Sequence, residues 1–263
     1  MPSTASPRAL TPAQIDAFIA DGFVRVDHAF PTALAAEARD ILWRDLGLDP
    51  DDPSGWTRPV VRLGMYTQPP FVAAANTSVL HAAFDQLVGE GRWRRCGAMG
   101  TFPVRFPSDE DPGDAGWHID VSFGDEGETN FLNWRANIRS RGRALLMLFL
   151  FSDIGPDDAP TRVRIGSHRA IARRLARAGE PGLSLGDLAA EDFGGTSGCR
   201  EALATGPAGT VYLCHPFLVH SAQPHRGTRP RFMAQPPLLP VDWPDGGVDP
   251  AFPVGRAIAA ALT

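Results

Sequence analysis

A histidine and an aspartate two residues apart, His118 and Asp120, have the clearest chemical potential in this sequence. On an extended strand, residues i and i+2 point to the same face, so this imidazole and this carboxylate can face one site together. They would supply two thirds of the two-histidine, one-carboxylate triad that binds non-haem Fe(II) and leaves open positions on the metal. The pair alone also fits a hydrogen-bonded surface pair, so a third ligand must decide between these interpretations.

The third ligand should come from a distant segment, and the four other histidines considered for it are His168, His215, His220 and His225. His168 follows Gly166-Ser167 at the expected start of a helix, where a capping or surface role is expected. His225 lies in a Pro/Arg/Gly loop, where we expect it to be solvated. His215 and His220 are five residues apart and face opposite sides of an unbroken strand. We favour His220, which directly follows an apolar run, and expect a structural role for His215.

A carboxylate cosubstrate would need a cation in a largely dry pocket, and the planar guanidinium of arginine can bind a carboxylate through two hydrogen bonds. Arg231 lies 11 residues after His220 and opens an apolar strand. Arg229 has the same strand parity and competes with it, although Pro230 favours a turn there. Arg231 is therefore the candidate carboxylate ligand, and an ordinary surface charge is the alternative.

Other side chains are candidates for contacts with small molecules. Thr101, on the strand expected before the histidine–aspartate pair, is a candidate contact for a cosubstrate. Trp134, Arg105 and Arg62 are candidates for the mouth of the site, and Trp134 lies in a polar segment, residues 130–137, that could form a lid. For each of them, an ordinary surface or packing role is the alternative.

The elements that must position these residues change in character near Cys96. Before it, a Thr11-Pro12-Ala13-Gln14 start predicts one helix, and apolar spacing predicts further helices at about 33–46 and 77–88. A short strand is expected at 23–26. These elements are expected to form a mainly helical support layer over residues 1–95.

From residue 96 onward, short strand-like segments alternate with Pro/Gly turns, which is typical of a jelly roll or small barrel. The expected strands are 96–106, 117–123, 144–152, 161–165, 209–215, 217–221 and 231–239. Helical insertions are expected at about 167–204, the first capped by Ser167, and a final helix at 254–262. The fold class is therefore expected to be mainly β with flanking helices (α+β), in a single domain over 1–263 with a jelly-roll core at 96–240.

Composition limits the classes of function. The 263 residues are 43% hydrophobic and 21% charged, as in ordinary globular proteins, and the net charge of −5 gives no basic footprint for nucleic acid. Three cysteines without a CxxC pair, and an N-terminus without a signal pattern, fit a reducing cytoplasm. The longest apolar run, 144–151, is too short to span a bilayer. We expect a cytoplasmic monomer or homodimer with no nucleic-acid or membrane partner.

The chain resembles the phytanoyl-CoA dioxygenase family of Fe(II)- and 2-oxoglutarate-dependent oxygenases from residue 10 to the strand after Arg231. The segments that carry the resemblance are Leu10-Thr11-Pro12-Ala13-Gln14, Asp21-Gly22-Phe23-Val24, Trp117-His118-Ile119-Asp120, Ile165-Gly166-Ser167-His168 and 209–221. Several positions depart from the family pattern: Ile165 replaces a proline, Asp158-Ala159-Pro160 stands for Asn-Gly-Pro, and Leu148 and Phe149 stand where many members carry a tryptophan. These departures affect the expected cosubstrate pocket more than the expected iron site.

The resemblance implies a double-stranded β-helix of the cupin-like, jelly-roll type. It implies Fe(II) bound by His118, Asp120 and His220, with Arg231 on the distal carboxylate of 2-oxoglutarate and O2 as the second cosubstrate. The implied reaction is hydroxylation of an unactivated C–H bond in a small molecule, with release of succinate and CO2. Asp120 favours hydroxylation over halogenation, because related halogenases carry a small residue there.

Two other classes of function remain open at this point. One is a metal-dependent cupin isomerase or lyase that does not use 2-oxoglutarate. The other is a non-catalytic module that binds a small molecule on the same scaffold. The substrate is barely encoded, and a small metabolite or natural-product intermediate is as well supported as an acyl-CoA.

Overall fold

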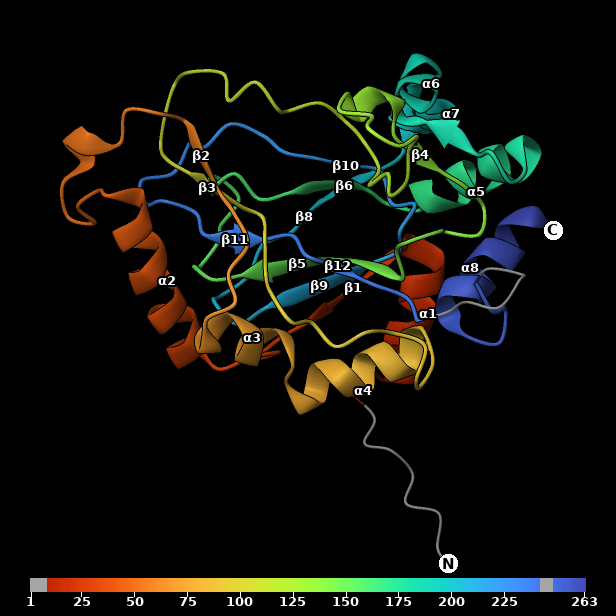
Figure 1. Cartoon of the computed structure of the whole chain (residues 1–263), viewed down its shortest axis with the longest axis horizontal. Coiled ribbons are helices and arrows are strands. Elements are labelled where there is room, and N and C mark those ends of the chain that lie inside the picture. The colour runs from red at the N-terminus through yellow and green to blue at the C-terminus, as the bar shows by residue number, and fades with distance from the viewer. Residues whose placement is uncertain (1–8, 242–247) are drawn as a thin grey trace, which may run out of the picture.

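The computed structural model describes residues 9–241 and 248–263, in which two antiparallel sheets face each other, with helices on the outer face of the larger sheet and at one end of the sheets (Figure 1). The larger sheet runs in the order β1 (Phe23–Val26), β9 (Val211–Cys214), β5 (Leu145–Leu150) and β11 (Met233–Ala234), with β12 (Pro237–Leu238) also paired to β5. The smaller sheet runs β10 (His220–Ser221), β6 (Arg162–Arg164) and β8 (Glu201–Leu203). This arrangement agrees with the expected jelly roll.

The central strand β5 is buried on both faces, which explains why its sequence is a continuous apolar run. Alternate residues pack outward against the helical layer: Leu145, Met147, Phe149 and Phe151. The intervening residues pack between the two sheets: Leu146, Leu148 and Leu150, in contact with a cluster that includes Val163 and Leu218. The period of two thus assigns Phe149 to the support layer and Leu148 to the interior.

Four helices cover the outer face of the larger sheet (Figure 1): α1 (Pro12–Asp21), α2 (Thr32–Leu46), α3 (Pro69–Ala75) and α4 (Ser78–Leu87). The first begins as predicted, because the Thr11 hydroxyl accepts from the Gln14 amide at 3.3 Å and the Gln14 side chain accepts from the Thr11 amide at 2.9 Å. It ends at Gly22 with φ of 90°, a left-handed conformation that glycine adopts without a steric penalty. The predicted helices near 33–46 and 77–88 are confirmed by α2 and α4.

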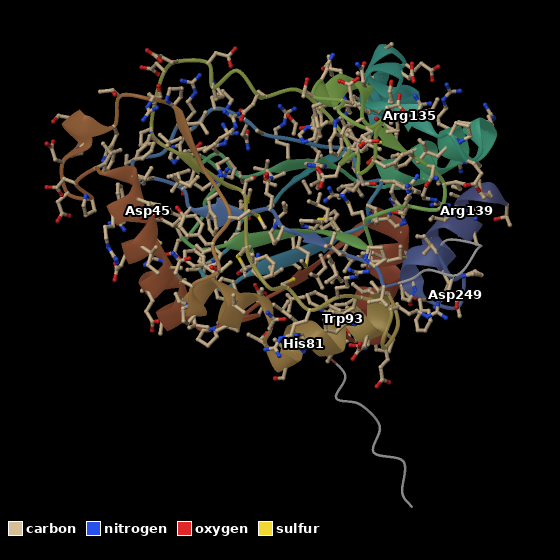
Figure 2. All side chains as sticks on the ribbon, viewed as in Figure 1. Asp45, His81, Trp93, Arg135, Arg139 and Asp249 are labelled. Carbon is tan, nitrogen blue, oxygen red and sulfur yellow. The ribbon has the colours of Figure 1, made fainter. Side chains whose placement is uncertain are left out.

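The loop after α4 is fastened to the helix by an aromatic contact at the edge of the molecule. The rings of His81 and Trp93, which are labelled in Figure 2, have centroids 4.8 Å apart. The Trp93 indole also donates to the Asp85 carboxylate at 2.8 Å. These contacts fix the chain where it leaves the support layer.

The remaining helices are α5 (Ser167–Ala178), α6 (Leu185–Ala190), α7 (Asp192–Gly195) and α8 (Pro253–Leu262). Their apolar faces share one cluster with Ile119, Val121, Phe217 and Val219, which lie along the segments that carry the histidine–aspartate pair and His220. The expected final helix at 254–262 is confirmed by α8. Helices of this second layer therefore support the segments that hold the candidate ligands. None of the helices in the described part of the chain is long and apolar enough to cross a membrane.

The remaining short elements lie at the ends of the sheets. They are two pairs of strands, β2 (Val60–Leu63) with β3 (Phe102–Arg105) and β4 (Arg135–Ala136) with β7 (Leu183–Ser184), and three 3-10 turns, η1 (Pro53–Gly55), η2 (Phe131–Asn133) and η3 (Thr196–Gly198). The pair β2–β3 matters for the site, because Arg105 at the end of β3 continues into a bridge with Arg231.

Several expected elements are wrong in detail. The helical insertion expected to reach residue 204 ends earlier, because β8 (Glu201–Leu203) pairs with β6. The expected strand at 117–123 holds only isolated bridges at His118 and Phe123. The expected strand at 96–106 is limited to β3, and neither α3 nor β2 was expected. The differences in the strands share one cause: tertiary pairing decides whether a short segment becomes a strand.

Ser167 does not cap α5 as expected. Gly166 occupies the cap position with φ of 77°, and the Ser167 hydroxyl instead accepts from the Val219 amide at 2.9 Å. His168, expected in a capping or surface role, is buried; its Nε2 donates to the Ile19 carbonyl at 3.1 Å. Its ring fits because Gly22 lacks a Cβ, which would lie 2.5 Å from Nδ1. The hydrogen bond from the Val219 amide to the Ser167 hydroxyl links α5 to the residue just before His220.

The buried pair His168 and His215 should make the fold sensitive to acid. Their ring centroids are 5.0 Å apart, and burial lowers the pKa of His168 to about 4. An unfolded histidine titrates near 6.5, so the unfolded state takes up the proton first and stability is lost as the pH falls from about 6.5 to about 4. Between pH 7.5 and pH 5, His168 alone should lower the free energy of unfolding by about 2 kcal/mol.

Urea unfolding at the two pH values measures this loss, and His168→Gln should shrink it. His28→Asn is the control, because His28 is exposed and its φ of 51° suits asparagine. An unchanged pH dependence in His168→Gln would contradict the assignment, whatever that variant does to overall stability.

Candidate metal centre

His118 and His220 meet across a two-way backbone bridge. The amide of each donates to the carbonyl of the other, at 2.9 Å in both directions. Ile119, between the two predicted ligands, is buried in the cluster around α5, whereas the side chains of His118 and Asp120 turn to the opposite side. Residues 118, 119 and 120 therefore face alternate sides, as the sequence predicts, although a single backbone bridge, between His118 and His220, holds them in this arrangement.

Both imidazoles are held in the same tautomer by the backbone. The Nδ1 of His118 lies 3.0 Å from the Gly116 carbonyl, and the Nδ1 of His220 lies 3.0 Å from the Leu218 carbonyl. Each Nδ1–H donates to a carbonyl two residues earlier, so each Nε2 keeps its lone pair. A histidine metal ligand is commonly oriented in this way, through a hydrogen bond from its second ring nitrogen.

The three candidate ligand atoms converge. One donor atom each of His118, Asp120 and His220 lies within 4.8 Å of the others, and the Asp120 Oδ1 is 3.7 Å from the His220 Nε2. Two imidazole nitrogens and one carboxylate oxygen form the donor set of the Fe(II) facial triad. The residues present thus fit a divalent iron in both number and chemistry.

Protonation also favours metal binding. Burial, reinforced by the neighbouring His118, lowers the pKa of His220 to about 4, so its imidazole is neutral near pH 7. Burial alone would raise the pKa of Asp120, but Arg143 and then the two histidines outweigh it and lower that pKa. Neutral imidazole and ionised carboxylate are the forms that coordinate metal.

Arg143, which the sequence interpretation missed, fixes the carboxylate of Asp120. Its Nη1 donates to the Asp120 Oδ2 at 2.7 Å, and both side chains are largely buried. This contact occupies one carboxylate oxygen and leaves Oδ1 toward the histidines, which favours a single Asp120 oxygen as ligand. No spacing in the sequence relates residue 143 to residue 120.

Arg143→Ala should weaken Fe(II) binding about 10- to 100-fold, the usual cost of removing a group that orients a metal ligand. Arg143→Lys should recover part of the loss, because it keeps a donor and the charge. Anaerobic metal titration measures both. Arg141→Ala is the matched control, since Arg141 is exposed and packs over the Phe123 ring at 5.2 Å. Equal Fe(II) affinities in Arg143→Ala and the wild type would show that Arg143 does not orient the metal ligand Asp120.

The histidines open onto a cavity of about 130 Å³. His118 and His220 line it together with Arg231, Arg105 and Arg62. Thr101, Thr161, Asp114 and Gln235 also contribute to its wall. Candidate metal ligands and candidate anion ligands, distant in sequence, therefore share one small polar space.

Arg231 is buried to 1% exposure at the start of the apolar strand, as expected. Its Nη1 donates to the Ala159 carbonyl at 2.5 Å and its Nη2 to the Pro103 carbonyl at 3.1 Å. Burial and then the nearby Arg105 lower the pKa of Arg231 well below its usual value. A buried guanidinium held only by neutral carbonyls is poised to bind an anion.

Other predicted residues occupy different places. Thr101 lines the cavity but is exposed, and Arg105 lies inside the cavity wall. Trp134 is not among the residues that line this cavity; its indole donates to the Glu128 carbonyl at 3.1 Å, and it packs against the α5–α6 cluster. His225, expected to be solvated, is only 4% exposed, and its Nδ1 accepts from the Gly227 amide at 3.1 Å.

His215 has the structural role expected for it. It is fully buried, with Nε2 3.3 Å from the Val254 carbonyl and Nδ1 accepting from the Phe217 amide at 3.1 Å. The chain is not one unbroken strand here, because β9 ends at Cys214 and β10 begins at His220. Gln235, which sequence reasoning missed, has the same strand parity as Arg231, so the same rule could have found it.

No protein-family model matches this chain, and no curated protein matches it. Solved structures do. HygX from Streptomyces hygroscopicus, with nickel and 2-oxoglutarate bound, is 21% identical over 89% of each chain with a TM-score of 0.56. EctD from S. alaskensis, with 2-oxoglutarate and 5-hydroxyectoine, is 21% identical over 89% of this chain and 77% of its own, with a TM-score of 0.56.

A third similar structure is SnoK, a non-heme alpha-ketoglutarate-dependent carbocyclase from nogalamycin biosynthesis. It is 13% identical over 90% of this chain and 87% of its own, with a TM-score of 0.50. At these identities the likeness establishes the fold, which this chain shares with 2-oxoglutarate-dependent oxygenases. The expected fold class is thereby confirmed.

Proposed function

We propose that this protein is a non-haem Fe(II)- and 2-oxoglutarate-dependent dioxygenase of the phytanoyl-CoA dioxygenase family that hydroxylates an unactivated C–H bond of a small molecule. One observation carries the proposal. Two histidines and an aspartate form a candidate ligand cluster, and both histidines line a cavity together with Arg231, a buried arginine whose partners among the described residues are neutral carbonyls. The metal triad alone would fit other cupin enzymes, whereas the arginine adds a place for the cosubstrate.

Each residue has a defined part in this proposal. His118, Asp120 and His220 hold the iron, and Arg231 binds the distal carboxylate of 2-oxoglutarate. An iron ion held by these residues would supply the activation of O2, with conversion of 2-oxoglutarate to succinate and CO2. Asp120 fills a ligand position with its own carboxylate, which favours hydroxylation over halogenation.

The substrate must lie largely outside the cavity that holds the cosubstrate. At about 130 Å³, this cavity is smaller than typical drug-sized sites of roughly 300–1,000 Å³ and suits one small diacid. Solved structures with this fold hold hygromycin B in HygX and 5-hydroxyectoine in EctD. We therefore propose a polar small metabolite or natural-product intermediate as substrate, with Trp134 and its lid segment as candidate contacts.

The proposal places the activity in a single domain over residues 1–263, in a cytoplasmic monomer or homodimer. It includes no nucleic-acid or membrane partner. These parts rest on composition and on the strand pattern described from the sequence. Native mass spectrometry of the purified chain checks the oligomeric part directly.

The test is anaerobic addition of Fe(II) and then 2-oxoglutarate, followed by visible spectroscopy. Chelation of iron by the 2-oxo acid group should give a weak charge-transfer band. A panel of small metabolites should then be scored by succinate release in air. Metal binding without the band would favour an isomerase or lyase that does not use 2-oxoglutarate, and a band without succinate for any substrate would favour a binding module.

A further inference from the structure

Two arginines stand directly opposite each other in the wall of the cavity. The Arg105 amide donates to the Arg231 carbonyl at 3.1 Å, and the Arg231 amide donates to the Arg105 carbonyl at 2.8 Å. In an antiparallel bridge of this kind, opposite side chains share one face and lie close together. The exposed fractions are only 2% for Arg105 and 1% for Arg231.

Hydrogen bonds within the protein leave part of this pair unsatisfied. The Arg105 Nη2 donates to both carboxylate oxygens of Asp114, each at 2.8 Å, while its Nε and Nη1 have no partner among the described residues. The Arg231 Nε likewise has none there. Three buried guanidinium nitrogens of two side chains thus have no hydrogen-bond acceptor among the described residues, and leaving buried donors unsatisfied is energetically unfavourable.

The charges of the cavity wall, like its unpartnered donors, favour an anion. Asp114 contacts Arg105 of this pair, and it is shared with Arg62 at the more exposed side. Arg231 contacts neutral carbonyls instead. Like charges directly opposite across a bridge repel, and a buried charge without a counter-charge is strongly unfavourable. The cavity wall therefore carries at least one uncompensated positive charge.

We propose that Arg105 and Arg231 form one anion site and that both guanidinium groups bind the distal carboxylate of the 2-oxo diacid. A carboxylate offers about four lone-pair positions, enough for the three unpartnered nitrogens. Its single negative charge offsets one of the uncompensated positive charges. This inference rests on the proposed function and extends it, because Arg105 becomes a cosubstrate ligand and not a contact at the substrate entrance.

Asp114 then acts as a positioning residue. Its two oxygens hold the Arg105 Nη2 and leave the Nε and Nη1 of that guanidinium, one on each side of Nη2, unpartnered among the described residues. The site should consequently discriminate strongly between a 2-oxo acid with a second carboxylate and one without it. A five-carbon 2-oxo monoacid cannot supply the charge that the two arginines require.

The experiment compares 2-oxoglutarate with 2-oxopentanoate, which has the same chain length but no distal carboxylate. Affinities are measured anaerobically on the Fe(II)-loaded protein by the charge-transfer band. In Arg105→Met, 2-oxoglutarate should bind about 10- to 100-fold more weakly, the range for lost charge-assisted hydrogen bonds, while 2-oxopentanoate should be unchanged. Arg105→Lys, which keeps the charge but not the planar fork, should lose less.

Two further measurements separate ligand binding from a structural role. Ligand-free Arg105→Met should melt no lower than the wild type, because a repulsive charge is removed from beside Arg231, and its Fe(II) affinity should not change. Exposed Arg229, replaced by methionine, is the control for losing an arginine nearby. Equal weakening of both 2-oxo acids, or no weakening of either, would overturn the two-arginine site and leave the proposed function standing. A wild type that binds iron but not 2-oxoglutarate would overturn both.

Discussion

Replacing His220 by alanine should abolish Fe(II) binding and all succinate formation. The His220 Nε2 lies 3.7 Å from the Asp120 Oδ1 within the one cluster of candidate metal ligands among the described residues, while its Nδ1 is committed to the Leu218 carbonyl. Loss of a ligand should exceed the roughly 10- to 100-fold cost of losing a group that only orients one. Anaerobic metal titration and the 2-oxoglutarate charge-transfer band measure the effect.

Asp120→Asn tests the same centre with almost no change in shape. It removes the charge that counters iron, so we expect metal affinity to fall by more than about 100-fold. Asp125→Asn is the control, because Asp125 is an exposed carboxylate five residues further along. A normal band in His118→Ala, His220→Ala or Asp120→Asn would show that the metal is bound elsewhere.

Arg231→Met should bind iron normally but lose 2-oxoglutarate. Truncating one partner of a buried charged pair costs about 2–5 kcal/mol, which corresponds to roughly 30-fold to several thousand-fold in affinity. The KM for 2-oxoglutarate should rise at least that far in the succinate assay. Iron affinity, measured without cosubstrate, should stay within about twofold of wild type.

Arg229→Met gives the matched comparison, because Arg229 has the same parity and precedes Arg231 by two residues but is exposed. Its affinity for 2-oxoglutarate should be that of the wild type. An isomerase or lyase that does not use 2-oxoglutarate predicts normal turnover in both variants. The two arginine variants therefore decide between that class and the dioxygenase.

The metal site could be approached from sequence because its geometry is largely local. The two-residue spacing of His118 and Asp120 sets their common face wherever the chain is extended, even though the structure supplies a single bridge and not a strand. His220 could be preferred to His215 because it directly follows the apolar run 216–219, which His215 precedes. Helices α1, α2 and α4 were likewise recoverable, since caps and apolar spacing are read within one element.

The contacts that tune the site could not be read in this way. Arg143 reaches Asp120 from 23 residues away, and Asp114 reaches Arg105 from a loop. Such pairs depend on how the segments cross and leave no period in the sequence. His225 was misjudged for the same reason: Pro and Gly neighbours predict a loop, but not that the loop folds inward beside Asp158.

The two-sided burial of β5 has a consequence for how this protein can diversify. Its outward residues belong to the cluster of the helical layer, while its inward residues belong to the cluster between the sheets. Changes at Phe149 and its outward companions should alter resistance to unfolding without reshaping the interior. Changes at Leu148 should alter the packing between the sheets and leave the helices in place. Libraries built on alternate positions of β5 can therefore vary packing against the helical layer and packing between the sheets separately.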